Sequence, residues 1–237
     1  MNGTEESARK LAKKVVEGTA GLPATVVICP PAIHIPYIAT ITKSNAVQIG
    51  GQDCHYEESG AFTGNISAKM LKELACEFVI VGHSERRAQH AETNEMVRKK
   101  AEAALKQNLR VILCVGETIE ERKSGKAKQV VEKQVKESMP KNADDYNVVI
   151  AYEPVWAIGT GEVATVADIK EMHLHIIRIC QHNLEKFANS KAKVLYGGSV
   201  KSTSAAEILQ TEGVGGVLVG GASLIADEFI NIAKAAR

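Results

Sequence analysis

The sequence predicts an α/β protein in which helices cover a parallel sheet. Two observations lead to this fold class: seven short apolar runs alternate with helix-like segments along the 237 residues, and the repeating unit is about 30 residues long. Such alternation makes the strands parallel and buries them on both faces. The spacing fits a single β/α barrel domain over residues 1–237, with an open, doubly wound sheet as the alternative. No GxGxxG motif follows the first strand, which weakens the dinucleotide-binding form of the open sheet.

The first half of the chain carries helix and strand signals in regular order. Thr4 precedes two glutamates and a helical pattern of apolar residues, so we expect it to cap the first helix, which is too polar for a signal peptide. Pro30 and Pro31 stop the first strand because proline cannot donate to a sheet ladder. The elements predicted here are a helix within Met1–Gly18, strand Ala24–Cys29, helix Ala32–Thr42, strand Ala46–Gly50, the long loop Gly51–Asn65, helix Ala68–Leu74, strand Phe78–Val81 and helix Glu92–Lys106.

The second half continues the alternation up to a C-terminal helix. Gly125 is expected to break a helical stretch, and Pro154 to end the strand that precedes it. No linker or low-complexity tract divides the chain, so we expect one domain. The elements predicted here are strand Arg110–Val115, helix Ile119–Ser138 with its break, strand Val148–Ala151, helix Val166–Ala188, strand Lys193–Tyr196, helix Thr203–Leu209, strand Gly215–Val219 and helix Ala226–Ala236.

Composition and charge exclude several classes of protein. The net charge is +1 with both signs interspersed, and aromatic residues make up 4%, which argues against a nucleic-acid-binding surface. No apolar run approaches the length of a membrane span. The five cysteines form no CxxC pair or His/Cys cluster with metal-site spacing, so we expect free thiols in a cytoplasmic protein without a metal. They are Cys29, Cys54, Cys76, Cys114 and Cys180.

A carboxylate lies at the end of the buried strand Val148–Ala151. Glu153 is followed by Pro154, by the single tryptophan Trp156, and by a glycine-containing tip that reaches Gly161. A carboxylate followed by a stiff segment and such a tip is the pattern of a catalytic base beneath a closing lid. The alternative is a strand that ends in an ordinary surface turn with an exposed glutamate, and this stretch alone favours that alternative.

A histidine follows another predicted strand. His83 comes after Phe78–Val81 and before Ser84–Arg87, which can open a short helical turn. Because the N-terminus of a helix disfavours positive charge, we expect a neutral imidazole that can donate a hydrogen bond to a carbonyl oxygen. A core histidine held by backbone groups is the alternative, and it is the commoner situation for a single histidine.

Two glycine pairs follow the last two predicted strands. One lies in Gly197–Ser199 and the other is Gly220 with Gly221. Glycines let backbone N–H groups approach an anion closely, and barrels often hold phosphate with the loops after their last two strands. The alternative is that these glycines only make tight turns. Two pairs, together with Gly159, favour a small phosphate ester as the ligand.

Six short motifs in order carry a resemblance to a known family. They are Ala61-Phe62-Thr63-Gly64, Val81–Arg87 (VGHSERR), Cys114–Glu117 (CVGE), Ala151–Gly161 (AYEPVWAIGTG), Tyr196–Val200 (YGGSV) and Val219–Leu224 (VGGASL). Together they resemble the triosephosphate isomerase family along almost the whole chain. The resemblance implies a TIM (β/α)8 barrel and an isomerase that interconverts dihydroxyacetone phosphate and glyceraldehyde 3-phosphate through an enediol(ate), in glycolysis and gluconeogenesis. It also implies a cytoplasmic homodimer that needs no cofactor or metal.

The resemblance also implies roles for individual residues. Glu153 is the base that moves a proton between adjacent carbons, and His83 is the neutral electrophile, with Glu85 in a supporting position. The implied phosphate-binding residues are Gly159, Ser199, Gly220 and Gly221. The implied lid consists of Pro154, Val155, Trp156, Ala157, Ile158 and Thr160, with a second hinge at Glu162–Ala164, and is held closed by Tyr196 and Ser199. Thr63 lies at the tip of a loop that enters the partner subunit.

The start of the sequence departs from the family pattern. In the family, a first strand ending in Asn-x-Lys directly precedes the segment matched by Met1-Asn2-Gly3, so we expect that strand and its lysine to be missing from the sequence as given, with activity and any dimer weakened. Either the start site is assigned one strand too late, or the truncation is real. With a real truncation, the alternative function is a catalytically impaired, phosphate-binding barrel remnant that acts by binding or assembly. A stop codon directly upstream of Met1 favours the remnant, and an in-frame strand favours the enzyme.

Overall fold

The computed structural model places the strands in the order predicted from the sequence. It describes residues 1–158, 163–183, 187 and 194–236. The strands are β1 (Val27–Ile28), β2 (Gln48–Gly51), β3 (Phe78–Val81), β4 (Arg110–Val115), β5 (Val148–Tyr152), β6 (Val194–Tyr196) and β7 (Val214–Val217). Within these residues they form one parallel sheet in the order β1-β2-β3-β4-β5-β6-β7, so each strand pairs with its neighbours along the chain.

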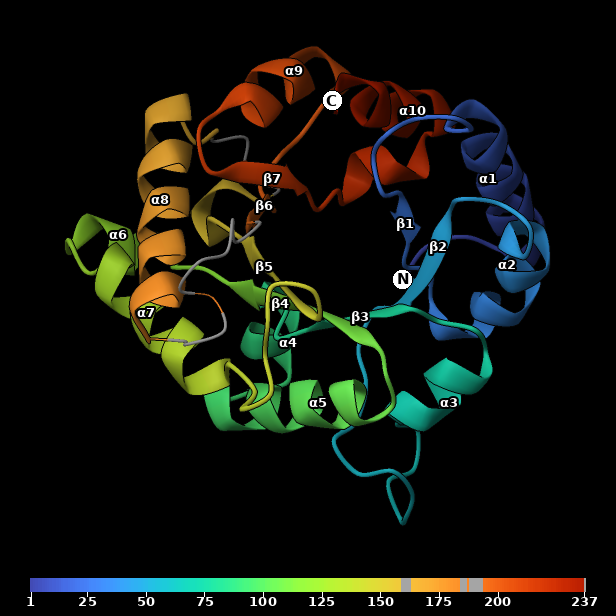
Figure 1. Ribbon diagram of the computed structural model, residues 1–237, viewed down its shortest axis with the longest axis horizontal. Coiled ribbons are helices and arrows are strands. Elements are labelled where there is room, and N and C mark those ends of the chain that lie inside the picture. Colours follow the sequence, from blue (N-terminus) through green and yellow to red (C-terminus); the bar gives the residue numbers. More distant parts are fainter. Residues whose placement is uncertain (159–162, 184–186, 188–193, 237) are drawn as a thin grey trace.

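Helices cover the outer face of the sheet, which curls around an axis roughly normal to the view (Figure 1). The α-helices are α1 (Glu5–Gly18), α2 (Ile35–Thr42), α3 (Ala68–Glu73), α4 (Ser84–Gln89), α5 (Asn94–Lys106), α6 (Ile119–Lys123), α7 (Ala127–Ser138), α8 (Val166–Asn183), α9 (Ser202–Gln210) and α10 (Ala226–Ala235). Short 3-10 turns are η1 (Ala32–His34), η2 (Val155–Ala157) and η4 (Gly221–Leu224). The last helix, α10, packs against the first, α1.

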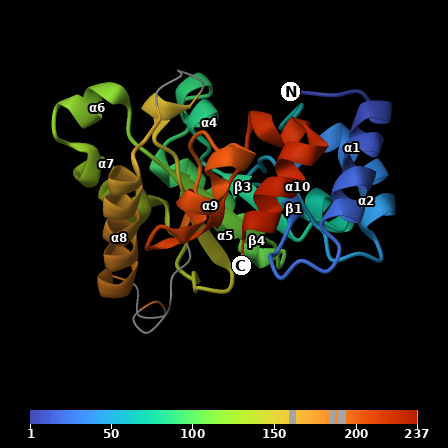
Figure 2. The ribbon, with the colours of Figure 1, turned by 90° about the horizontal axis from the view of Figure 1, so that it is seen from above.

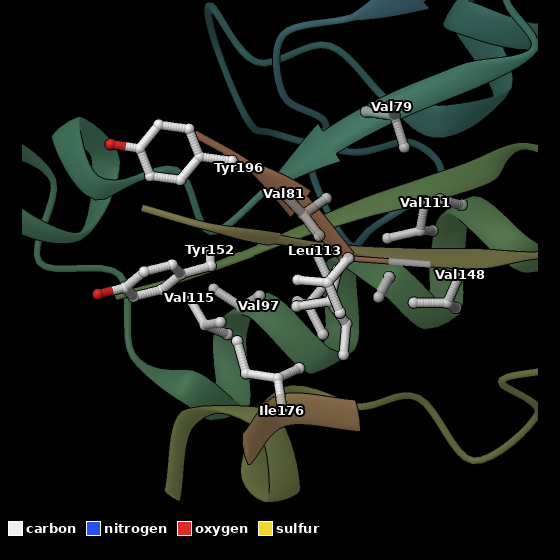
Figure 3. Close-up of a cluster of buried hydrophobic side chains, with 14 of the residues drawn as sticks. Val79, Val81, Val97, Val111, Leu113, Val115, Val148, Tyr152, Ile176 and Tyr196 are labelled. Atoms are coloured by element: carbon white, nitrogen blue, oxygen red, sulfur yellow. The ribbon is translucent and has the colours of Figure 1, made fainter. Parts of the chain in front are cut away.

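Successive residues of the central strands pack into two different cores. In β3, Val79 and Val81 belong to the large cluster beneath the helices, whereas Phe78 and Ile80 belong to a separate cluster on the inner face. This follows from the two-residue repeat of a strand. Figure 3 shows part of the outer cluster, in which strand residues meet Ile176 of α8. Both faces of the sheet are therefore buried, as the sequence predicts.

The two strands at the ends of the sheet are β1 and β7. In the part of the chain that the structure describes, no ladder joins them. β1 therefore pairs only with β2, over Val27 and Ile28, and it is shorter than the predicted strand Ala24–Cys29. The absence of a family strand from this chain stays a prediction.

Two helix boundaries follow local capping. The predicted helix Glu92–Lys106 begins at Asn94 instead, because Thr93 caps it and accepts a hydrogen bond from the N–H of Met96 at 3.2 Å. The predicted break at Gly125 is confirmed, since it separates α6 from α7. The predicted C-terminal end of α8 falls on residues 184–188, of which only 187 is described.

The carboxyl ends of the strands lie along one edge of the sheet. α4 follows β3 and α6 follows β4, and Figure 2 shows both helices on the same side. In the ladders, Val115 of β4 pairs with Tyr152 of β5, and Tyr152 pairs with Tyr196 of β6. Residues just beyond these three are therefore neighbours, and Glu153 is one of them.

Candidate active site

Glu153 extends from the end of β5 toward the inner face of the sheet. Tyr152 belongs to the outer core and Ala151 to the inner one, so the strand alternation places Glu153 on the inner side. Its backbone N–H donates to the carbonyl oxygen of Val115 at 2.8 Å, which continues the pairing with β4 by one residue. Only 2% of Glu153 is exposed. An exposed glutamate in a surface turn, the alternative that the stretch alone favoured, is therefore wrong.

Two groups at the start of α4 bind the Glu153 carboxylate. Nε2 of His83 lies 2.8 Å from Oε1 of Glu153, and the backbone N–H of Ser84 donates to Oε2 at 2.9 Å. N–H groups in the first turn of a helix have no acceptor within the helix, which makes them suitable donors to a carboxylate. The sequence predicted Glu153 and His83 as separate candidates and missed Ser84. The structure brings all three together.

Opposing influences act on the charge of His83. This residue caps α4, and its Nδ1 accepts a hydrogen bond from the N–H of Glu85 at 3.3 Å, which leaves the ring proton on Nε2 facing Glu153. Burial lowers the pKa of His83, but the hydrogen bond and charge of Glu153, with the charge of Glu85, outweigh burial and hold this pKa above 6.5. The helix start thus selects the tautomer of the neutral ring. The contact with Glu153 favours the positive charge, contrary to the sequence expectation.

Glu153→Gln is expected to lower the pKa of His83, because it removes the charge that raises this pKa and leaves burial acting alone with the weaker effect of Glu85. In the parent protein, the stabilisation from the charged pair is complete below pH 6.5 and is lost as the pH rises through the raised pKa of His83. NMR titration of the His83 ring gives both midpoints, with Glu171→Gln on α8 as a remote control. Equal midpoints in Glu153→Gln and the parent would contradict the assignment of Glu153 as the group that raises the pKa of His83.

Two glycines let neighbouring backbone pass close to Glu153. A Cβ atom on Gly116 would lie 1.7 Å from the carbonyl oxygen of Glu153, and one on Gly197 would lie 2.9 Å from its Cγ. The side-chain amide of Gln134 fixes Gly116, accepting from its N–H at 2.8 Å and donating to its carbonyl oxygen at 2.9 Å. Gly116 belongs to the CVGE motif and Gly197 to the YGGSV motif. The spacing of these motifs in the sequence does not reveal that both glycines approach Glu153.

A second buried carboxylate holds the residues on both sides of Glu153. Oε1 of Glu117 accepts from the hydroxyl of Tyr152 at 3.1 Å and from the indole N–H of Trp156 at 2.9 Å. The backbone carbonyl of Glu117 also accepts from the N–H of Val155 at 3.2 Å. Burial, and then the charge and hydrogen bond of Glu117, raise the pKa of Tyr152, so its hydroxyl remains a donor. Glu117 is the last residue of the CVGE motif, and the sequence predicts no role for it.

The predicted phosphate-binding residues lie after β6 and β7. Ser199 Oγ donates to the carbonyl oxygen of Ala157 at 3.0 Å, which ties the end of β6 to η2. Gly220 and Gly221 are exposed at the start of η4, and a Cβ atom on either would meet no atom within 4 Å. Because β6 lies between β5 and β7, these residues share one edge of the sheet with Glu153. The other residues predicted for the phosphate site and the lid, Gly159, Thr160 and Glu162, lie outside the described residues.

The hydroxyl of Tyr196, which the family resemblance assigns to the lid, is buried. It has no hydrogen-bond partner among the residues that the structure describes, and burial raises the pKa of Tyr196 to about 12. Figure 3 shows this hydroxyl and that of Tyr152 pointing in the same direction, away from the aliphatic core. The described part of the predicted lid forms η2, which begins after Pro154.

The described residues hold no group of three or more His, Cys, Asp or Glu side chains arranged to bind a metal ion. None of the helices in this part of the chain combines the length and hydrophobicity needed to cross a membrane.

Known proteins are similar to this chain in sequence and in fold. A family model described as triosephosphate isomerase matches residues 1–236. The triosephosphate isomerases of Xanthobacter flavus and Rhizobium meliloti are 47% and 46% identical, over 99% of this chain and over 94% and 92% of their own lengths. The crystal structure of the triosephosphate isomerase from Bartonella henselae has a TM-score of 0.92 and 41% identity, over 99% of this chain and 94% of that one. The chain belongs to the triosephosphate isomerase family, and its fold is that of a TIM barrel.

Proposed function

We propose that the protein interconverts dihydroxyacetone phosphate and glyceraldehyde 3-phosphate, as an intramolecular aldose–ketose isomerase of glycolysis and gluconeogenesis. The observation that carries this proposal is the contact between the Glu153 carboxylate and Nε2 of His83 at the strand ends. A proton acceptor and an N–H donor thereby face the same small region of a largely buried site. A reaction that moves a proton next to a carbonyl group needs these two groups.

The reaction begins when Glu153 takes a proton from the carbon next to the substrate carbonyl. The electron pair of the broken C–H bond forms the C=C bond of the enediolate, and negative charge develops on the carbonyl oxygen. His83 donates its Nε2–H to that oxygen and so stabilises the charge. Glu153 then returns the proton to the adjacent carbon, while the hydroxyl proton of the first carbon passes by way of Nε2 of His83 to the former carbonyl oxygen. These two transfers exchange the positions of carbonyl and hydroxyl. The reacting atoms all belong to the substrate and the side chains, so the proposed reaction uses no cofactor.

Both carboxylate oxygens of Glu153 are engaged by His83 and Ser84 in this structure. To reach a substrate carbon, the carboxylate has to leave these partners. His83 then loses the main contact that raises its pKa, and burial favours the neutral ring. A neutral ring with its proton on Nε2 is the donor that the proposed reaction needs.

The phosphate of the substrate is proposed to bind the backbone N–H groups of Gly159, Gly220 and Gly221, with Ser199 beside them. The open space around Gly220 and Gly221 supports this placement. Segment 154–160 is proposed to cover the bound substrate. Covering the substrate excludes water, which strengthens the electrostatic interactions and protects the enediolate from side reactions.

We also propose a homodimer formed through the loop Gly51–Asn65, in the cytoplasm. Figure 1 shows this loop projecting beyond the ring of helices, between β2 and α3. Its tip is ordered by its own contacts: the ring of Phe62 packs 4.2 Å from that of His55, and Asn65 donates to the carbonyl oxygen of Phe62 at 2.9 Å. An ordered, exposed tip fits insertion into a second copy. Five unpaired thiols support a reducing compartment.

Thr63→Arg is expected to shift the protein from dimer toward monomer, because the exposed tip would bring a large charged side chain into the proposed interface. Sedimentation velocity over a range of concentrations measures the shift. Thr203→Arg, the same substitution at an exposed position of α9, is the matched control and should leave the equilibrium unchanged. The same dimer fraction in both variants would argue against this loop as the interface.

The proposed isomerisation is tested with the purified protein in both directions, with each product coupled to its own dehydrogenase. We expect saturable conversion of either triose phosphate that inorganic phosphate inhibits competitively. Binding of phosphate at Gly220 and Gly221 without conversion of either substrate would instead support a binding protein.

A further inference from the structure

Arg122 of α6 contacts three groups that belong to different parts of the site. Its Nη1 lies 3.4 Å from Oε1 of Glu117, and its Nη2 lies 2.5 Å from Oδ1 of Asp168 on α8. Its guanidinium carbon also lies 4.5 Å from the centre of the Trp156 ring. The N–H donors of a guanidinium are held in one plane as a rigid fork, so a single rigid group contacts Glu117, Asp168 and Trp156.

Through Glu117, Arg122 is connected to Tyr152 and Trp156, which lie on either side of Glu153 in the sequence. Glu117 is fully buried, and the other hydrogen-bond partners of its carboxylate among the described residues, Tyr152 and Trp156, are neutral donors. An ionised carboxylate without an opposite charge is costly to bury. Within the described residues Arg122 is the cation that pairs with Glu117, so it supplies the opposite charge beside this buried carboxylate.

Through Asp168, Arg122 is connected to the start of α8, at the far end of the segment that follows Glu153. Oδ2 of Asp168 accepts from the N–H of Thr165 at 3.0 Å and from its hydroxyl at 2.6 Å. Burial alone would raise the pKa of Asp168, but the hydrogen bonds of Thr165 and the charge of Arg122 hold it below its ordinary value. Thr165 directly precedes α8, and Trp156 lies three residues after Glu153. Arg122 therefore joins the two flanks of residues 157–164.

We propose that Arg122 is a positioning residue for Glu153, which it fixes by tying Glu117 and Trp156 to Asp168 at the start of α8. The inference rests on the proposed isomerase function, because it concerns the placement of the proposed base. Arg122 touches neither Glu153 nor any other reacting group in this role. Loss of the fork leaves Glu117 without its counter-charge and separates the two flanks, so Glu153 no longer returns to one position in each turnover.

The test compares Arg122→Gln, Asp168→Asn and the double variant in steady-state kinetics, at a temperature where all of them are folded. Asp168→Asn keeps the shape of the side chain and carries the test if the Arg122 variant does not fold. Arg122→Lys restores the positive charge without the fork. Lys128→Gln is the matched control, because it removes the 2.6 Å ion pair of Lys128 with Glu171. Glu171 lies on α8, as Asp168 does, but outside the site. Trp156, the single tryptophan, reports the state of its surroundings by fluorescence.

We expect kcat to fall about tenfold in each single variant with little change in KM, which is the scale typical of residues that act through others. The double variant should fall no further than the singles, since both break one connection. Trp156 emission should shift in the Arg122 variant, Arg122→Lys should recover part of kcat, and Lys128→Gln should match the parent. Parental kcat in the folded single variants, or independent losses that multiply in the double variant, would overturn the inference. A parent that does not isomerise would refute the proposed function instead.

Discussion

Glu153→Asp is expected to lower kcat for isomerisation by on the order of 10²-fold, because a base displaced by about 1 Å loses that much rate. Aspartate keeps the charge and shortens the side chain by one methylene, so the carboxylate retracts toward β5. In the parent, both oxygens of Glu153 have partners at 2.8 and 2.9 Å, which shows how closely its present length fits the site. The fall should appear in kcat in both directions of the reaction.

The matched control for this variant is Glu171→Asp, since Glu171 is exposed on α8 and pairs only with Lys128 among the described residues. It should keep the parental rate. Circular dichroism and thermal melting establish that both variants are folded. If Glu153→Asp isomerised as fast as Glu171→Asp, Glu153 would not be the base.

Gly116→Ala is expected to have the largest effect of any single methyl group in the site. Its Cβ atom would lie 1.7 Å from the carbonyl oxygen of Glu153, and a backbone atom cannot turn aside as a flexible side chain does. The ends of β4 and β5 would have to separate, which displaces Glu153 and breaks the hydrogen bond from its N–H to Val115. We expect the free energy of unfolding to fall by about 3 kcal/mol or more and kcat to fall at least as far as in Glu153→Asp.

Gly216→Ala provides the matched comparison. Its Cβ atom would meet only the end of the Leu195 side chain, at 2.9 Å, which can move. Urea unfolding measures the stability of both variants, and the isomerase assay measures their rates. Equal stability and equal rates in the two alanine variants would show that β4 and β5 are not packed as described at Gly116.

Much of the fold follows from local signals in the sequence. β3 and β4 have the predicted bounds because both are apolar runs buried on two faces, which few other conformations accommodate. The predicted cap at Thr4 is also found, since its side-chain oxygen accepts from the backbone N–H of Ser7 at the start of α1. β1 was predicted too long because the extent of an edge strand depends on the neighbours with which it pairs.

The candidate site was predictable only in part. Glu153 and His83 could be named from their positions after apolar strands, because parallel strands bring their carboxyl ends to one edge. Their direct contact, and the Ser84 N–H that completes it, depend on the distance between two strand ends with β4 between them. The raised pKa of His83 follows from that contact, so helix position alone predicted the wrong direction. Glu117 carried no local signal, since its partners are distant in sequence.

The role of Glu153 as the base that moves the proton is tested most directly by hydrogen exchange between substrate and solvent. Dihydroxyacetone phosphate is incubated with the protein in D2O, and NMR follows the entry of deuterium at the carbon that loses its proton. We expect exchange by the parent protein and a fall of about 10²–10⁴-fold in Glu153→Gln, the range typical of a lost general base. Exchange by folded Glu153→Gln at the parental rate would contradict it.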